Sequence, residues 1–525
     1  MPTLNWIGKE AVVRHHRDVP YRLLEPVADL SCGETDSGNL IVEGDNLHAL
    51  KALLPRYAGK VKCIYIDPPY NTGNEGWVYN DNVNSPEIRR WLGEVVGKEG
   101  ETLDRHDRWL CMMYPRLVLL KQFLAEDGVL LMSLDDNEAG HAKLLLDEIF
   151  GSANFIAQLV WEKGRKNDAR FFSVGHEYIF VYAKSKSHLK SKKTIWRQEK
   201  EGASQIYEEY LRLKSVHDGD LSKIEAGLRS FYKSLERNHP SKKHSRYNKV
   251  DQNGVWRDDN MSWPGGNGPK YEVKHPVTKQ PCAIPNGGWR YSTPEKMQAM
   301  IDEGKVIFRE DHTESPIRKT YLVRDKTLGL EDSEDIGREV MGSYFYRSGI
   351  QAANELHEIF GDKSFPNPKD KDIIGSLVNY VTCNDKHAVI LDSFAGSGTT
   401  AHAVLKLNTL DNGQRNFIAV EINANVAVQV TRQRICRVVS GYKGKNSESI
   451  EGLGSGFQYC KLSEHPLFTA DGEIRADVTF AQLAEFVWFA ETGSGFTGDA
   501  KSPLLGIHEG RAIYLLYNGI LNDKS

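Results

Sequence analysis

Four consecutive residues, Asp67, Pro68, Pro69 and Tyr70, carry groups that could hold a planar amine for chemistry. The Asp67 carboxylate and the Pro68 carbonyl both accept hydrogen bonds, so together they could bind the two N–H groups of an amine and orient its lone pair toward a reagent. The prolines make the turn rigid. Tyr70 offers a flat face on which a flipped base could stack. The alternative interpretation is a surface Pro-Pro turn with an incidental carboxylate.

The position of this turn favours the chemical interpretation. An apolar, β-branched run from Val61 to Ile66 predicts a buried strand that ends at Asp67. In open α/β sheets, ligands bind at the carboxyl ends of the strands. The residues that follow, 71–104, are rich in Asn and Gly and predict a loop over the site.

A second motif, DSFAGSGTT, runs from Asp392 to Thr400 and also follows a predicted strand. Its glycines let the backbone approach a ligand closely. The spacing differs from the GxxxxGK[ST] loop of nucleotide hydrolases, and the third glycine of the dinucleotide fingerprint is missing. The next strand ends at Glu421, 25 residues after Gly396, where an acid could bind ribose hydroxyls. Alone, the motif is equally consistent with the glycine turn of any doubly wound domain.

The elements around both motifs alternate between strands and helices. Strands are predicted at 39–45, 61–66, 128–135, 388–391 and 416–420, with a closing pair at 156–162 and 176–184. Helices are predicted at 46–57, 105–125, 138–150, 371–381, 400–407 and 425–440. This alternation predicts an α/β fold with a doubly wound sheet whose helices cover both faces.

Changes in composition divide the chain. We expect an N-terminal arm, two halves of one α/β domain separated by an inserted domain, and a small C-terminal αβ domain, with bounds 1–38, 39–185, 186–350, 351–443 and 444–525. Residues 184–250 hold 17 Lys and Arg against 8 Asp and Glu, and include two predicted helices joined at 218–220. That stretch contacts DNA or is a pair of solvated helices; composition alone does not decide. Trp256, Trp263 and Trp289 are interpreted as core residues rather than base-stacking ones.

Whole-chain composition restricts the class of protein. The 67 Lys and Arg nearly balance the 71 Asp and Glu, so net charge neither supports nor excludes DNA. Seven scattered cysteines form no CxxC pair, which predicts reduced thiols and no zinc or other metal site. We find no signal peptide and no apolar run of about 20 residues, so we expect a soluble cytoplasmic protein without a membrane partner.

The two motifs together are far more specific than either alone. The chain resembles the amino-methyltransferases of DNA, in the permuted order in which DPPY precedes FxGxGT. The resemblance implies a Rossmann-like, circularly permuted fold that binds S-adenosylmethionine, with Asp67, Pro68, Pro69 and Tyr70 as the catalytic motif. The cofactor-binding residues that it implies are Asp45, Lys369, Asp392, Phe394, Ala395, Gly396, Gly398, Thr399, Thr400 and Glu421. Among them Glu421 would bind ribose, Asp45 the adenine and Lys369 the methionine end.

Longer segments resemble the modification subunit of type III restriction–modification systems. They are YIDPPYNTGN, LLMSLDDNE, HEYIFVYAK, YEVKHPVTKQPCAIPNGGWR and AIYLLYNGIL. The resemblance implies methylation of double-stranded DNA, a homodimer, a helicase–nuclease restriction subunit as partner, and target recognition by the inserted domain. Members of that family usually continue beyond the last of these segments.

Three functions remain open. The first is methylation of adenine N6, the second is methylation of cytosine N4, and the third is a DNA-reading subunit that recruits a nuclease. In the family that the chain resembles, cytosine enzymes more often begin the motif with Ser, so Asp67 favours adenine. The intact Asp67 and Tyr70 favour an enzyme over a purely DNA-reading subunit. No general base is expected, Asp135 and Asp136 are expected to cap a helix, and His176 to serve packing.

Overall fold

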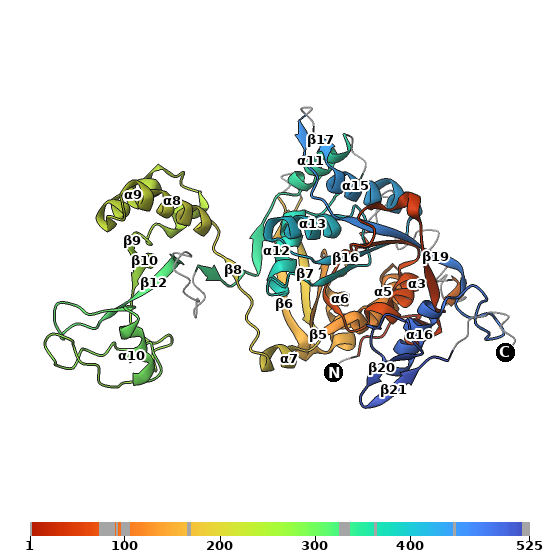
Figure 1. Cartoon of the computed structure of the whole chain (residues 1–525), viewed down its shortest axis with the longest axis horizontal. Coiled ribbons are helices and arrows are strands. Elements are labelled where there is room, and N and C mark those ends of the chain that lie inside the picture. Colours follow the sequence, from red (N-terminus) through yellow and green to blue (C-terminus); the bar gives the residue numbers. More distant parts are fainter. Residues whose placement is uncertain are drawn as a thin grey trace. The chain divides into compact units, whose positions relative to one another are not determined.

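The computed structural model describes residues 3–72, 90, 93–95, 105–164, 170–324, 337–361, 365–444 and 448–516. The expected loop at 71–104 lies mostly outside these residues. The chain divides into two compact units, Met1–Trp196 with Gly342–Ser525, and Arg197–Met341. Figure 1 shows the elements of both units.

The first unit is built on an 11-stranded sheet. In spatial order its strands are β1 (Arg22–Pro26), β19 (Gly456–Pro466), β3 (Leu40–Glu43), β16 (Asn416–Glu421), β15 (Val389–Asp392), β4 (Val61–Ile66), β5 (Leu124–Leu134), β7 (His176–Ala183), β6 (Phe155–Glu162) and β14 (Tyr344–Tyr346), with β2 (Cys32–Gly33) paired to β19. From β3 to β5 every neighbouring pair is parallel. The carboxyl ends of these five strands therefore lie along one edge, which we call the carboxyl edge.

Helices cover both faces of this sheet, so its central strands are buried on both sides. The helices α3 (Asn46–Tyr57), α5 (Arg105–Phe123) and α6 (Ala139–Leu146) pack together in one layer. The helices α12 (Lys371–Val381), α13 (Thr399–Asp411) and α15 (Gln433–Ser440) pack together in the other (Figure 1). The doubly wound α/β fold predicted from the sequence is confirmed.

Strand order reverses between β15 and β4. From β15 the chain passes through α13 to β16 on one side, and from β4 it passes through α5 to β5 on the other. Such a switch point opens a crevice at the carboxyl ends of the two central strands, and ligands bind there in open α/β sheets. The two motifs, which begin at Asp67 and Asp392, follow these two strands.

The predicted elements close to the motifs match the structure well. The bounds of α3 and β4 are those predicted, and α8 (Ala203–Val216) and α9 (Leu221–Ser234) are joined at the predicted turn. The predicted helix at 425–440 is instead α14 (Ala424–Val426), a π-helical segment and α15. The predicted helix at 138–150 likewise ends in a π-helical segment after α6.

Both ends of the chain are more integrated than expected. The segment 1–38, expected to be an irregular arm, contains α1 (Lys9–Val12) and α2 (His15–Asp18) and supplies β1 to the sheet. Trp6 and Val12 are buried in the main core. The segment 444–525, expected to be a separate domain, supplies β19, which lies between β1 and β3. Phe457 and Tyr459 of β19 are fully buried, because this strand is internal to the sheet.

The second unit has its own small cores. The helices α8 and α9 pack near a four-stranded sheet of β11 (Val306–Ile307), β12 (Ile317–Arg324), β10 (Gly254–Asp259) and β9 (Lys249–Asp251), with α10 (Pro294–Asp302) beside β11. Trp256 and Trp289 are buried in this unit, as the core interpretation predicts, whereas Trp263 is only half-buried.

The described residues contain further helices and strands. They are α7 (Lys186–Ser191), β8 (Gln198–Glu199), β13 (Arg338–Glu339), α11 (Gly349–Phe360), β17 (Tyr442–Lys443), β18 (Ser449–Ile450), α16 (Phe480–Thr492), β20 (Leu504–His508) and β21 (Arg511–Tyr514). Within the described ranges, no helix has the length and apolar character that a membrane crossing requires.

Candidate active site

A crevice at the switch point brings the two motifs together. Its lining comes from the end of β4, the loop after β15, the start of α13 and the segment before α12. The lining residues are Tyr65, Asp67, Phe365, Asn367, Pro368, Lys369, Asp392, Phe394, Ala395, Gly396, Ser397, Thr399 and Thr400. Most of the predicted catalytic and cofactor residues therefore meet here, although the motifs lie far apart in the sequence.

The predicted catalytic turn, residues 67–70, is held from two sides. The single proton of the Tyr70 hydroxyl is shared between Asp67 Oδ1 at 2.9 Å and Glu177 Oε2 at 3.1 Å. The Trp109 indole N–H donates to the Pro69 carbonyl at 2.7 Å. Burial and the nearby Asp67 carboxylate raise the pKa of Tyr70 well above its ordinary value, so its phenol stays neutral. The orientation of the tyrosine ring is thereby set before any ligand enters.

Lys369 lies across the crevice against this turn. Its Nζ is 2.7 Å from Asp67 Oδ2, 3.5 Å from Glu177 Oε2 and 4.8 Å from the centre of the Tyr70 ring. Its carbonyl accepts a hydrogen bond from Thr399 Oγ1 at 3.4 Å, at the start of α13. Burial lowers the pKa of the Lys369 ammonium, but Asp67 and Glu177 outweigh that effect and raise it. The side chain expected at the methionine end of a cofactor thus contacts the catalytic turn.

Glu177 is a member of this cluster that sequence reasoning missed. It is the second residue of β7 and also pairs with Lys163. Burial alone would raise the pKa of Glu177, but the ammonium groups of Lys369 and Lys163 outweigh it and lower the pKa. The only sequence signal was an acid at the start of an otherwise apolar strand, in the segment HEYIFVYAK.

The loop after β15 is organised by a buried carboxyl group. Asp392 Oδ1 accepts the Phe394 backbone N–H at 3.0 Å, and Oδ2 accepts the Thr400 hydroxyl at 2.5 Å. Burial raises the pKa of Asp392 to about 7. Gly396 and Gly398 have positive φ values of 49° and 75°, which glycine adopts without strain. Asp392 therefore spans the loop from strand to helix.

Glu421, the last residue of β16, binds the backbone of the same loop. Its Oε2 accepts the Gly396 backbone N–H at 2.8 Å, and its Oε1 accepts the Asn423 N–H at 2.9 Å. Thr431 Oγ1 donates to the Gly396 carbonyl at 2.6 Å. The acid predicted to bind ribose thus lies beside the glycine loop, where it also fixes the backbone of that loop.

Asp45 does not line the crevice. Its carboxylate caps α3 by accepting the backbone N–H groups of Leu47 and His48 at 2.9 and 3.2 Å. The same carboxylate pairs with the buried Arg116 at 3.2 Å. Its neighbour Asn46 donates to the Ser393 carbonyl at 3.3 Å, which links this strand end to the glycine loop.

A second network missed from the sequence surrounds Glu138. This fully buried carboxylate accepts hydrogen bonds from the Asn71 side chain, from His106 Nδ1 at 2.8 Å and from His141 Nδ1 at 3.0 Å. Arg105 Nε donates to His106 Nε2 at 3.3 Å, which places the His106 proton on Nδ1, facing Glu138. The cluster has metal-ligand types, but this tautomer makes it a hydrogen-bond network that holds Asn71, the residue after the catalytic motif.

The other polar residues singled out in the sequence have local roles. The expectation that Asp135 or Asp136 caps the helix is wrong, because Glu138 holds the N-cap position of α6. Asp135 Oδ1 instead accepts the Asn137 backbone N–H at 2.9 Å in the turn before α6. His176 Nε2 lies 2.9 Å from the Tyr178 hydroxyl. All seven cysteines are free thiols.

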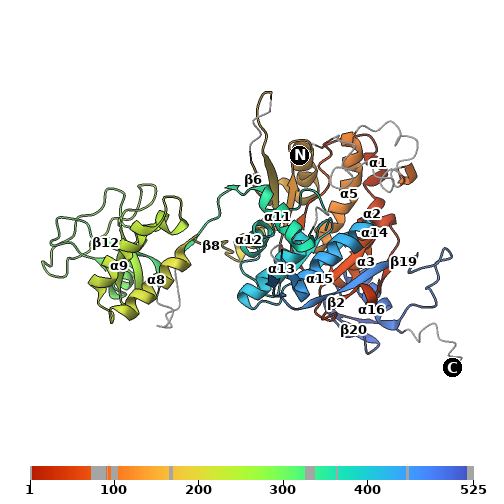
Figure 2. The same ribbon diagram turned by 90° about the horizontal axis from the view of Figure 1, so that it is seen from above.

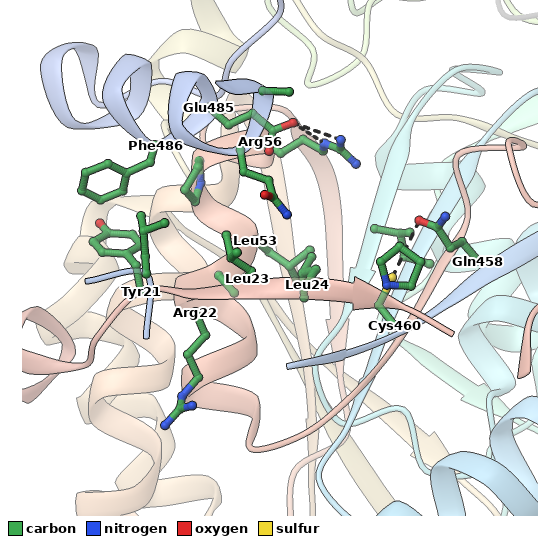
Figure 3. A pocket seen from close by; sticks show the side chains of 17 residues that line it. Tyr21, Arg22, Leu23, Leu24, Leu53, Arg56, Gln458, Cys460, Glu485 and Phe486 are labelled. Carbon is green, nitrogen blue, oxygen red and sulfur yellow. Dashed lines mark hydrogen bonds and ion pairs between the residues drawn. The ribbon is translucent and has the colours of Figure 1, made fainter. Parts of the chain in front are cut away.

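A separate cavity of about 230 Å³ lies beside β1, the outermost strand of the sheet, between β1, β19, α3 and α16. Figure 3 shows Tyr21 beside Phe486 and the Arg56–Glu485 ion pair, whose Nη2–Oε1 distance is 3.0 Å. These contacts join α16 to the body of the unit, and the cavity gathers no cluster of chemically active groups. It is a packing feature of the C-terminal segment.

Comparison with known proteins agrees with the geometry. A family model described as DNA methylase matches residues 61–432, which is well over half of the chain. The EcoP15I Mod subunit of Escherichia coli, a type III restriction-modification enzyme, is 33% identical over 80% of this chain. The StyLTI Mod subunit of Salmonella typhimurium is 30% identical over 94% of this chain, and the type II methyltransferase M.KpnI of Klebsiella pneumoniae is 30% identical over 76%.

The matched share of these relatives differs. The chain spans 64% of the length of the EcoP15I subunit, 71% of the StyLTI subunit and 84% of M.KpnI. The family match includes both motifs, the strands β4, β5, β6, β7, β14, β15 and β16 of the sheet, and the intervening unit. This chain belongs to the DNA methylase family.

Proposed function

We propose that the chain transfers a methyl group from S-adenosylmethionine to the N6 amine of an adenine in double-stranded DNA. The observation that carries this proposal is the single crevice in which the Asp67 turn and the Asp392–Thr400 loop meet. One motif has the acceptors for an amine, and the other has the glycine loop and acids for a nucleoside. Neither could perform the reaction alone.

The residues present fit S-adenosylmethionine. The Ser393 hydroxyl in the glycine loop is buried and has no hydrogen-bond partner within the described part of the chain. The Glu421 carboxylate, at the end of β16, lies beside the same loop and could accept ribose hydroxyls. Around these groups Asp392, Phe394, Ala395, Gly396, Gly398, Thr399 and Thr400 would form the cofactor wall. When bound, the cofactor supplies an electrophilic methyl group.

The crevice must widen for this ligand. Its volume is about 20 Å³, whereas ligand pockets usually hold about 300–1,000 Å³. Phe365 and Lys369 fill much of the space, and a Cβ atom built on Gly396 would lie 3.3 Å from the Phe365 ring. We infer that the segment from Phe365 to Lys369 shifts when the cofactor enters, and that Lys369 then contacts its methionine end.

The catalytic turn can orient the substrate amine. The Asp67 carboxylate and the Pro68 carbonyl would accept its two N–H groups, while the Tyr70 ring stacks on the flipped base. Lys369 already donates to Asp67 and lies over the Tyr70 ring, so its ammonium occupies positions that the amine and the base would take. Withdrawal of Lys369 would free both. The methylated amine then loses its extra proton to solvent.

The identity of the base rests on Asp67. A second candidate is cytosine N4, whose enzymes in the family more often begin the motif with Ser. The aspartate at position 67 is the argument for adenine. Methylome sequencing separates the two bases directly.

We further propose a role as the modification subunit of a type III system in the cytoplasm. Similarity to two such subunits over 80% and 94% of the chain supports it. In this role the inserted domain, 186–350, would recognise the target sequence, and the basic stretch 184–250 would bind phosphates. A homodimer and a helicase–nuclease restriction subunit would be its partners.

The test is expression of the full chain in a bacterial host without DNA methyltransferases, followed by single-molecule sequencing that detects N6-methyladenine and N4-methylcytosine. We expect N6-methyladenine at one short sequence motif, and none from the Asp67→Ala variant. N4-methylcytosine at a motif would show that the substrate base is cytosine and not adenine. Unmodified DNA from a host that makes folded protein would overturn it.

A further inference from the structure

Two phenylalanines stand almost fully in solvent on the connection between β6 and β7. The exposed fractions are 85% for Phe171 and 92% for Phe172, and the nearby Val174 is 57% exposed. Contiguous exposed apolar surface is a mark of interaction sites, whereas single exposed apolar residues are normal. Figure 2 shows the β6 region projecting from the body of the first unit.

This aromatic pair is rooted at the carboxyl edge. Strand β7 is antiparallel to β5, so β7 begins where β5 ends, on the edge that carries Asp67. Strand β6 is antiparallel to β7 and therefore ends at the same edge. The described ends of the connection, residues 163–164 and 170–175, therefore lie at the carboxyl edge.

Contacts join both arms of this connection to the catalytic turn. On the β7 arm, Glu177 accepts the Tyr70 hydroxyl at 3.1 Å and lies 3.5 Å from Lys369 Nζ. On the β6 arm, Lys163 pairs with the same Glu177. Contact of DNA with Phe171 and Phe172 would therefore act, through Glu177 and Lys163, on the residues that are proposed to position the substrate amine.

The charge around the pair favours a polyanion as its occupant. The Arg170 guanidinium lies 5.5 Å from the centre of the Phe171 ring. The sequence from 163 to 175, KGRKNDARFFSVG, has four basic residues and one acid, in a chain whose overall net charge is −4. A stable contact with a second copy would need about 800 Å² from each partner, which two phenylalanines and a valine cannot supply.

We propose that Phe171 and Phe172 form a wedge that enters the base stack of DNA beside the target base. Removing a base from the duplex costs stacking and pairing energy, and apolar wedges inserted between base steps are a known way to stabilise unstacked DNA. The wedge rests on the proposed function, because it needs a flipped base in the crevice. It adds to that function two side chains, Phe171 and Phe172, that would fill the space left in the duplex by the flipped base.

The test compares two duplexes that carry the methylation site found by sequencing. One is fully paired, and the other has an abasic site opposite the target adenine, which makes flipping easier. We measure single-turnover transfer of a radioactive methyl group by the full chain, by a Phe171→Ala/Phe172→Ala double variant, and by Leu410→Ala as control. Leu410 is 70% exposed on α13, away from the connection.

The wedge predicts a loss of about tenfold or more for the double variant on the paired duplex, with most of the rate recovered on the abasic duplex. It also predicts that 2-aminopurine placed at the target position brightens with the unchanged chain and stays dim with the variant. The control should match the unchanged chain on both duplexes, and thermal unfolding should show all three proteins equally folded.

Three results would overturn the wedge. Equal loss on both duplexes would indicate a general DNA contact, and equal activity of all proteins would indicate no role. A loss that accompanies dissociation of a dimer in light scattering would assign the pair to a second copy of the chain. If the unchanged chain methylates neither duplex, the proposed function itself fails, and that result is visible without any variant.

Discussion

The Lys369 ammonium lies 2.7 Å from Asp67 Oδ2, and the Lys369 carbonyl meets the Thr399 hydroxyl at 3.4 Å. One residue thus contacts the Asp67 turn with its side chain and the start of α13 with its backbone. The two motifs come from distant parts of the chain, and Lys369 links them in addition to the pairing of β4 with β15. Its loss should affect both stability and catalysis.

Replacing Lys369 with Met keeps the length of the side chain and removes its charge. Breaking a buried ion pair costs about 3–5 kcal/mol because it leaves the partner charge uncompensated. We expect a lower free energy of unfolding and a large loss of methyl transfer. Lys371→Met is the matched control, since this lysine pairs with Glu355 on the neighbouring helix. Chemical denaturation and methyl transfer would show both variants destabilised and only Lys369→Met inactive; an active, folded Lys369→Met contradicts the assignment.

Asp392 predicts a specific pH dependence of stability. Burial raises its pKa to about 7 in the folded protein, from a model-compound value of 3.8. The folded state therefore binds this proton more tightly, and the contribution of Asp392 to stability is lost as the pH rises from about 4 to about 7. The loss amounts to roughly 4 kcal/mol at most.

The Asp392→Asn variant removes this ionisation. It should unfold at a higher temperature than the unchanged chain at pH 8, and the gain should shrink strongly at pH 5. Melting curves of the cofactor-free protein at both pH values provide the measurement. An equal effect at the two pH values would mean that the Asp392 carboxyl is ordinary.

Gly396 should not tolerate a side chain. Its φ of 49° lies in the left-handed region, and an added Cβ would lie 3.3 Å from the Phe365 ring. We expect Gly396→Arg to abolish measurable binding of S-adenosylmethionine in calorimetry. Gly140→Ala is the control, because nothing lies within 4 Å of its added Cβ. Unaltered affinity in Gly396→Arg would show that the cofactor binds elsewhere.

Glu138 should act through Asn71. The Glu138→Gln variant keeps the size of the side chain but replaces one carboxylate oxygen with an NH2 group. This donor would face the imidazole N–H group of His106 or His141. We expect a lower rate of transfer with little change in cofactor affinity, because the network holds the residue after Tyr70. Partial recovery of the rate in Glu138→Asp would support a positioning role. An unchanged rate of methyl transfer in Glu138→Gln would show that Glu138 has no positioning role.

Most of the architecture near the motifs follows from local patterns. Strand β4 and helix α3 have apolar residues at the periods of a strand and a helix, and their predicted bounds agree with the structure. Strands β1 and β19 escaped prediction because they pair with each other across the whole length of the chain. Their sequences are partly polar, and only the neighbouring strands make them part of the sheet.

The site was predictable to the extent that its residues lie in motifs. The Asp67 turn and the Gly396 loop carry recognisable spacing, and both line the crevice. Glu177 and Glu138 are single acids without a spacing signal, and their importance comes from tertiary contacts. Asp45 follows a strand as expected, but the N-terminus of α3 and Arg116 bind its carboxylate.

The central claim is that Asp67 orients the amine that receives the methyl group. Its most direct test is the transfer of a radioactive methyl group to DNA by purified Asp67→Ala protein, beside Asp135→Ala as a control at the end of the next strand. Asp135 accepts a hydrogen bond from Asn137 within its own turn, so this variant should retain activity. We expect a folded Asp67→Ala protein that still binds S-adenosylmethionine and transfers no methyl group; labelled DNA from that protein would contradict the role of Asp67.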